Sequence, residues 1–459
     1  MRNTIRKLFI LYISIWMFPA IGLGAAIKAG VAKVDITPPL GLKMYGYGSR
    51  KEGATGILDP LYARVLVLEA GEQRVAMVVC DLGRVFAPPW VERLRRDAKE
   101  KYGITYVLAA AIHTHAGPDI PDEYPPLEGP DWETPVLEKI EHAIGAAHQS
   151  AVEARLGTGY GVAYIGHNRL REQANGRFGW FMVNHTMLPT SPVDPTVSIL
   201  RVDNAAGDPM AILVNYACHP VVFGPDNLQY SADWPGVMDA TVERALAKEN
   251  SSPAPLCFFL QGGDGDINPF YAVTPLAQDA VGRRDWTGNR LGQEAARVAG
   301  SIVTKPEPEG SLQFTEDWLD MHMRWNPDKF RAAVLTSWGP EAAASFDRHA
   351  HEPLRLPVAT LLINKRIAFM TMPGEPFVDF QTDWRNRCPV PDAFFMGYAN
   401  GDFGYLPTVL AASRGGYGAA STATSVEVGA GERMVNQALV RVYEMLGRLI
   451  DEPEDLTKK

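Results

Sequence analysis

Two histidines separated by one residue, His113 and His115, follow an apolar stretch and precede a Gly-Pro turn at residues 117–118. The apolar residues 106–108 predict a strand, along which side chains alternate between the two faces. On such a strand, His113 and His115 would point the same way at the strand's end. Two neighbouring imidazoles can bind a metal ion, or can act as one ligand and one general acid or base. The alternative is a pair of ordinary histidines at a polar strand end.

Further apolar runs also end in side chains that suit chemistry. The turns that follow them contain His219, an acidic and glycine-rich segment at residues 261–269, Glu375 and Tyr405. Ligand sites in α/β proteins usually lie at such strand ends. Histidines, a glutamate and a tyrosine together suit a mononuclear zinc site that keeps one coordination position open for water. The pattern therefore favours a metal-dependent hydrolase.

The elements that must position these residues alternate along the chain. Strand-like apolar runs and amphipathic charged stretches follow one another, which predicts an α/β or mixed α+β fold. We expect mixed sheets flanked by helices in a single large catalytic domain at residues 27–453, because no repeat or low-complexity linker divides the chain. Residues 305–357 have a weaker pattern and are expected to be peripheral, where they can cover the site. The expected elements are strands at 61–69, 74–81, 197–202, 210–218, 256–261 and 393–398, a strand pair at 358–372, helices at 90–102, 134–154, 236–250, 289–303 and 432–450, and a loop at 400–424.

Residues 1–24 predict a secretory signal peptide. Arg2, Arg6 and Lys7 precede an almost entirely apolar run at 8–23, and small residues follow it. We therefore expect a secreted or periplasmic protein with no membrane span after cleavage; an uncleaved N-terminal anchor is the alternative. Because this segment carries three basic and no acidic residues, its removal changes the net charge from −9 to −12. An acidic exported protein is a poor candidate for binding nucleic acid or an anionic membrane surface.

A set of short motifs spread over nearly the whole mature chain resembles the neutral/alkaline non-lysosomal ceramidase family, specifically its N-terminal catalytic domain. The motifs lie at residues 35–37, 44–47, 61–64, 113–118, 168–169, 219–220, 231–233, 265–269, 374–375, 404–405 and 417–422. Members of that family are zinc-dependent amidases that cleave the N-acyl bond of ceramide. The resemblance implies a small-molecule or lipid substrate.

The resemblance also implies roles for individual residues. Its zinc ligands correspond to His113, His219, Glu375 and Tyr405. His115 would then lie beside the metal and move protons. Arg169 and Tyr417 would contact the substrate and the oxyanion. Apart from the resemblance, the local sequence leads us to expect Asp266 to be a structural turn residue that orients the site and His167 to lie in a surface loop.

The chain departs from the family pattern at two points. Asn268 occupies the position of a serine implicated in catalysis, and no counterpart of the family's C-terminal immunoglobulin-like domain is expected. An asparagine side chain only donates and accepts hydrogen bonds, so Asn268 cannot act as a nucleophile. A water activated by zinc needs no serine, because zinc lowers the pKa of a bound water to about 7.

These inferences predict an exported zinc-dependent hydrolase of the neutral ceramidase family that cleaves an N-acyl amide in ceramide or a ceramide-like lipid. One alternative is a zinc hydrolase of a non-lipid substrate, such as another amide, an ester or a carbohydrate. Another is a catalytically weak binding protein that kept the fold. The presence of all four implied ligands argues against that last alternative, because an idle site has no physical need for them.

Overall fold

The computed structural model describes residues 26–127, 129–248, 254–350 and 352–453. The expected signal peptide, residues 1–24, lies outside the described residues. Within them, no helix combines the length and apolar character that a membrane crossing requires.

The largest sheet is mixed and contains the apolar runs expected as strands. Its order is β13-β11-β10-β6-β1-β3-β4-β5, with β15 paired to β6. Most neighbours are antiparallel, but β4 runs parallel to β5 and β11 runs parallel to β13. The strands are β1 (Lys28–Asp35), β3 (Tyr62–Ala70), β4 (Gln73–Cys80), β5 (Tyr106–Ala111), β6 (Val152–Val162), β10 (Thr196–Asn204), β11 (Pro209–Tyr216), β13 (Leu256–Gln261) and β15 (Lys305–Pro306).

The two outer strands of this sheet approach each other. Strand β13 contacts β4 and β5, although it lies at the opposite end of the strand order. The side-chain amide of Gln261, at the end of β13, donates to the carbonyl oxygens of Ile112 at 3.1 Å and Cys218 at 3.0 Å. These two residues follow β5 and β11. The carboxyl ends of β5, β11 and β13 therefore meet in one place.

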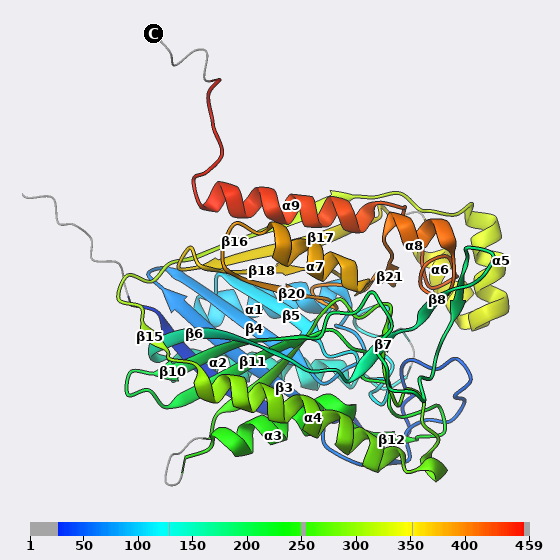
Figure 1. Ribbon diagram of the computed structural model, residues 1–459, viewed down its shortest axis with the longest axis horizontal. Helices are drawn as coiled ribbons and strands as arrows, with labels where there is room; N and C mark the ends of the chain where they lie inside the picture. The colour runs from blue at the N-terminus through cyan, green and yellow to red at the C-terminus, as the bar shows by residue number, and fades with distance from the viewer. Residues whose placement is uncertain (1–25, 128, 249–253, 351, 454–459) are drawn as a thin grey trace, which may run out of the picture.

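Helices cover the outer surfaces of the large sheet. Helices α1 (Pro88–Tyr102) and α2 (Glu133–Gln149) contact β5, β1 and β3, whereas α3 (Asp233–Leu246) and α4 (Ala280–Ser301) contact β13, β10 and β6. Helix α1 is amphipathic and packs against the sheet with its apolar side, which buries Trp90, Val91, Leu94 and Ala98. Figure 1 shows α3 and α4 along one side of the molecule and α9 (Ala430–Met445) along the opposite side, with the strands between them.

A second sheet adds another layer. Its order is β16-β17-β18-β20, formed by Leu312–Asp320, Arg355–Ile363, Ile367–Thr371 and Asp392–Met396. Helices α7 (Val378–Arg387) and α9 pack on it, and β20 contacts β11 and β13 of the large sheet. The buried amide of Asn215 joins the sheets, because it donates to Leu260 at 2.9 Å and to Phe395 at 2.7 Å.

Short elements gather at one end of the molecule. Helices α5 (Pro327–Trp338) and α6 (Pro340–His349) lie there beside α8 (Val409–Arg414) and β8 (Leu170–Glu172) (Figure 1). Helices α5 and α6 share a small apolar cluster of their own, built on Phe330, Val334 and Ala343. The remaining short elements are β2 (Gly56–Ile57), β7 (Gly166–Asn168), β9 (Phe178–Trp180), β12 (Gln229–Tyr230), β14 (Ile267–Pro269), η1 (Leu276–Gln278), β19 (Glu375–Pro376) and β21 (Tyr405–Leu406).

The predicted fold class, an α/β domain with mixed sheets flanked by helices, is confirmed. The helix predicted at 134–154 was too long: α2 ends at Gln149, and residues 152–162 form β6 instead. The alternating glycines of β6, Gly157, Gly159 and Gly161, lie directly under the side chains of Ile302, Val298 and Glu294, which leaves no room for a β-carbon. The loop expected at 400–424 also contains β21 and α8, and the region 305–357 contains β16, α5 and α6.

Candidate metal centre

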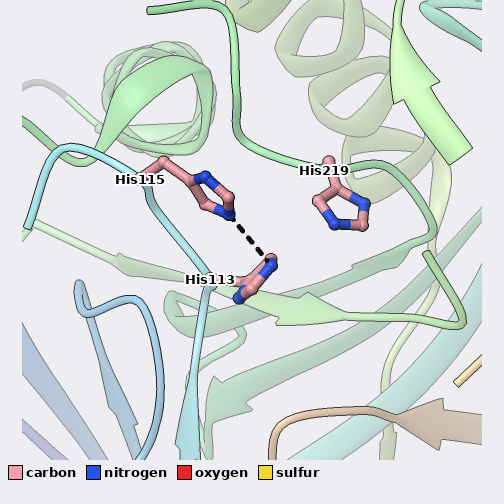
Figure 2. Close-up of side chains that lie close together, drawn as sticks. All are labelled: His113, His115 and His219. Atoms are coloured by element: carbon pink, nitrogen blue, oxygen red, sulfur yellow. Dashed lines mark hydrogen bonds between the residues drawn. The ribbon is translucent and has the colours of Figure 1, made fainter. Parts of the chain in front are cut away.

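Three imidazoles converge where β5 and β11 end. The ligand atoms of His113, His115 and His219 all lie within 4.8 Å of one another, and the group could hold a metal ion. Figure 2 shows the rings of His113 and His115 joined by a close contact, which the Nε2 atoms make at 3.2 Å, with His219 facing them. His113 and His219 are fully buried, and His115 is partly buried.

A turn, rather than strand alternation, brings His113 to this place. Strand β5 ends at Ala111, and His113 has a φ of +72°, in the left-handed region that few non-glycine residues adopt. Its Nδ1 contacts the carbonyl oxygen of Gly83 at 2.7 Å, and its ring stacks on Tyr398 at 4.0 Å. The rings of His113 and His115 lie together, but the prediction that strand alternation places them there was wrong, because β5 ends before either residue.

His219 is held by backbone groups on both sides. Its Nδ1 contacts the carbonyl oxygen of Asp264 at 2.7 Å, and its backbone N–H donates to Ile267 at 3.0 Å. An Nδ1–H that donates to a carbonyl fixes the tautomer, so the Nε2 lone pair of His219 and of His113 is free for a cation. Burial lowers the pKa of His219 to about 3, which keeps this imidazole neutral.

Glu375 adds a carboxylate to the same point. Its Oε2 lies 3.2 Å from Nε2 of His219 and 3.5 Å from Nε2 of His113. Without a bound cation, burial alone would raise the pKa of Glu375, but the charge of a protonated His113 and hydrogen bonds from His113 and His219 hold it well below its usual value. A cation that binds these Nε2 atoms would displace their protons. The carboxylate is therefore negative, as a metal ligand must be.

Two distances at this point are close to the separation expected between ligands of one tetrahedral metal ion. Ligand atoms at about 2.0–2.1 Å from a zinc ion lie about 3.3 Å from one another in tetrahedral geometry. The observed separations of 3.2 Å and 3.5 Å from Glu375 Oε2 to the two imidazoles agree with this value. The donor set, neutral imidazoles and a carboxylate, is also one that zinc prefers. The residues present thus fit the metal that the sequence predicts.

Tyr405 lies next to Glu375 and joins the centre to Arg169. Strands β19 and β21 pair in parallel, with Glu375 opposite Tyr405. The Tyr405 hydroxyl accepts a hydrogen bond from Nη2 of Arg169 at 2.8 Å and also interacts with the Glu375 carboxylate. Arg169 further donates to Gly265 at 2.7 Å and to the Oδ1 atom of Asn268 at 3.2 Å. Its Nε has no partner among the described residues.

Tyr417 and Trp180 extend this group toward the surface. The guanidinium of Arg169 lies over the rings of both Tyr405 and Tyr417, at 5.2 Å and 5.3 Å. The Tyr417 ring stacks on Trp180 with ring centres 4.7 Å apart, and 54% of Trp180 is exposed. The predicted residues Arg169, Tyr405, Tyr417 and Asn268 are therefore in one group, in contact with the metal centre through Glu375.

His115 differs from the other two imidazoles. Its Nδ1 has no hydrogen-bond partner in the described part of the chain, and the rings of Tyr45 and Tyr47 meet it edge-on at 5.5 Å and 5.1 Å. Burial, followed by the neighbouring charges of His113 and His219, holds the pKa of His115 well below its usual value. No carbonyl oxygen fixes Nδ1 of His115, unlike that of His113 and His219, so this ring is the least constrained of the three.

Two residues that touch the centre were not predicted as site residues. Asp264 contacts His219, and Tyr398 stacks on His113. Both follow buried strands, which is the signal that could have identified them.

The prediction for His167 was wrong, because this residue is fully buried in β7, where Nε2 contacts the carbonyl oxygen of Phe181 at 3.0 Å. Asp266 is a structural turn residue as expected: its carboxylate accepts from Asn168 at 2.6 Å and from the backbone N–H of Val378 at 2.9 Å.

The fold and the site together define an α/β protein with a buried candidate metal centre of histidine and carboxylate donors. Residues 27–277 match the family model described as neutral/alkaline non-lysosomal ceramidase, N-terminal, and the chain belongs to this family. It is 24% identical over 260 residues to neutral ceramidase A of Dictyostelium discoideum, a match that covers 53% of this chain and 36% of that relative. The chain thus spans about a third of the length of this curated relative.

Solved structures share the fold over nearly the whole chain. The crystal structure of neutral ceramidase from Pseudomonas aeruginosa gives a TM-score of 0.71 at 18% identity, covering 93% of this chain and 76% of that one. A structure of a ceramidase complexed with C2 gives a TM-score of 0.70 at 18% identity, covering 94% and 76% of the two chains. At this identity the likeness establishes the architecture, whereas the chemistry must be argued from the residues.

Proposed function

We propose that this protein is an exported zinc-dependent amidohydrolase that cleaves the N-acyl bond of ceramide or a ceramide-like lipid. The observation that carries the proposal is the convergence of the Nε2 atoms of His113 and His219 on one carboxylate oxygen of Glu375. Membership of a family whose characterised relatives are named as ceramidases supports the amide substrate. The proposal includes a signal peptide at residues 1–24, a catalytic domain at 27–453 and a secreted or periplasmic location.

In this proposal His113, His219, Glu375 and Tyr405 hold the zinc ion. Bound there, zinc would supply a Lewis acid that polarises the amide carbonyl and lowers the pKa of a water molecule to about 7. Tyr405 would bind through its hydroxyl, to which Arg169 already donates a hydrogen bond at 2.8 Å. Burial holds the pKa of Tyr405 well above its usual value, and the Arg169 guanidinium offsets part of that effect, which favours the phenolate form that a metal ligand requires.

His115 serves as the general base and then as the general acid. Its Nδ1 has no partner among the described residues, and its ring is only partly buried, so it can exchange protons with the reacting groups. It takes a proton from the attacking water and returns one to the nitrogen of the leaving amine.

Arg169 and Tyr417 stabilise the oxyanion that forms as water adds to the carbonyl carbon. Arg169 is fixed by Gly265, Asn268 and Tyr405, and it retains one donor, Nε–H, that no described residue occupies. A donor of this kind contributes about 3–4 kcal/mol to the stability of a developing oxyanion. In this scheme Asn268 orients Arg169 through Oδ1 and takes no part in bond formation.

The test combines metal content with a substrate screen on the purified full chain. We expect about one zinc ion per chain and turnover of N-acyl sphingoid bases, and we expect both to be lost in His113→Ala. Turnover of N-acyl sugars or peptides instead would keep the zinc chemistry and replace the lipid substrate. Stoichiometric zinc without turnover of any amide, ester or glycoside would favour a binding protein, and a protein purified without metal would refute the zinc site.

A further inference from the structure

The buried carboxylate of Asp264 contacts His219 directly and is linked to His113 through Tyr398. Asp264 is fully buried. Its Oδ1 accepts a hydrogen bond from the hydroxyl of Tyr398 at 2.5 Å, and its Oδ2 lies 3.2 Å from Nδ1 of His219. The carbonyl oxygen of the same residue contacts that Nδ1 at 2.7 Å. Asp264 therefore holds His219 through its backbone and its side chain together.

Tyr398 links Asp264 to the second imidazole, that of His113. This tyrosine is 1% exposed and has a φ of +50°, an unusual conformation for a bulky residue. Its ring stacks on His113, with ring centres 4.0 Å apart and an interplanar angle of 23°. The hydrogen bond from the Tyr398 hydroxyl to Asp264 fixes the Tyr398 ring. The orientations of His113 and His219 therefore both depend on the Asp264 carboxylate.

The burial of Asp264 needs a compensating positive charge. An isolated carboxylate in the protein interior is strongly disfavoured, and two of them close together are more so. Among the described residues, the only ion-pair contact of Asp264 is with His219, and Oδ2 has no hydrogen bond. The carboxylate of Glu375 contacts the same imidazole from the other side. A divalent cation held by the imidazoles would supply the missing charge.

We propose that Asp264 and Tyr398 form a positioning pair for the metal centre, which fixes the ring orientations of His113 and His219 and thereby strengthens the binding of a divalent cation. The inference rests on the proposed function only in requiring that the imidazoles bind a metal. Groups that orient histidine ligands typically contribute 10- to 100-fold to metal affinity. Neither residue touches the substrate in this scheme, so both act through the two histidines.

The experiment measures cation affinity directly in Asp264→Asn and Tyr398→Phe. Both changes keep the shape of the side chain; the second removes only the hydroxyl. We expect Zn²⁺ and Co²⁺ to bind the full-length variants about 10- to 100-fold more weakly in competition with a chelator. The visible absorption spectrum of bound Co²⁺ should also change, because the ring orientations relax.

Asp266→Asn is the matched control, because Asp266 is a buried carboxylate in the same turn that bonds Asn168 and Val378 rather than a histidine. We expect it to lower the melting temperature of the metal-free protein while leaving cation affinity within about threefold of the wild type. Wild-type affinity in Tyr398→Phe, or an equal loss in Asp266→Asn, would overturn the inference and leave the proposed function standing. A wild-type chain that binds neither cation would refute both. Should Asp264→Asn fail to fold, Tyr398→Phe decides alone.

Discussion

The guanidinium of Arg169 donates a hydrogen bond at 2.8 Å to the hydroxyl of Tyr405, which lies opposite Glu375 in a parallel strand pair. The proposed oxyanion donor and a proposed metal ligand are thus bonded to each other. A change in either residue should therefore affect both metal binding and transition-state stabilisation.

Replacement of Arg169 by lysine should reduce kcat/KM by about 100- to 1,000-fold, because a point charge cannot reproduce the planar set of donors. Lysine would lose at least one of the contacts to Gly265, Asn268 and Tyr405. Steady-state kinetics on the preferred amide substrate would measure the change. Metal content serves as the control and should fall much less than in His113→Ala. Unchanged kcat/KM would remove Arg169 from the mechanism.

Replacement of His219 or Glu375 by alanine should abolish both bound metal and activity. Each change removes one of the atoms that converge on the proposed metal position, where Glu375 Oε2 lies 3.2 Å from His219 Nε2 and 3.5 Å from His113 Nε2. Elemental analysis of the purified variants, together with activity in the presence of added Zn²⁺, would measure this. Full activity without metal in either variant would show that the centre has another purpose.

Asn268→Ala should weaken catalysis without abolishing it. The substitution removes one hydrogen-bond acceptor from Arg169, and a hydrogen bond to a charged group contributes about 1.5–3 kcal/mol. We therefore expect kcat to fall by about 10- to 100-fold while metal content is unchanged. A loss as complete as in Glu375→Ala would show that Asn268 takes part directly in the reaction, contrary to the mechanism proposed above.

Glu133 should make the stability of the protein depend on pH away from the metal centre. It is fully buried at the start of α2, and neither carboxylate oxygen has a hydrogen-bond partner within the described residues. Burial, reinforced by Asp131, raises the pKa of Glu133 from 4.5 to about 8. Because the folded state holds the proton more tightly than the unfolded state, this group favours folding below about pH 4.5 and loses that contribution as the pH rises through 8.

Thermal unfolding of wild type and Glu133→Gln between pH 5 and pH 9 would test this effect. The melting temperature of the wild type should fall more steeply with rising pH than that of the variant, whose amide cannot ionise. Because both measurements use the same metal-loaded protein, effects of pH on the metal centre cancel in the comparison. Parallel curves would mean that Glu133 is ionised or solvated in the folded state.

Local pattern was sufficient to predict much of the fold. Strands β3, β4 and β13 each contain an apolar run, and they lie within a residue or two of their predicted limits. The end of α2 was missed because Ala151 and Ala154 continue its small-residue pattern, whereas the glycines that pack β6 against α4 take effect only in the folded chain. Tertiary packing overrode local propensity at that position.

The site was predictable where a motif marked it and not where its parts are brought together by the fold. His113, His219, Glu375 and Tyr405 all stood out because they follow apolar runs, and their assignment as the four metal ligands came from the family resemblance. The roles of Asp264 and Tyr398 arise only because the ends of β5, β13 and β20 meet, so no local pattern could pair Asp264 with Tyr398. His167 was misplaced for the same reason: its burial depends on β7 pairing with β14.

The donors of the centre come from segments that are far apart in the chain. The region matched by the family model, residues 27–277, contains the three histidines, whereas Glu375 and Tyr405 belong to the part that carries the second sheet. A cation bound to all of them would act as a crosslink that closes a loop of the chain only in the folded state. Because a ligand that binds only the native state stabilises it by mass action, chelation would lower the melting temperature of the entire domain as well as stopping catalysis.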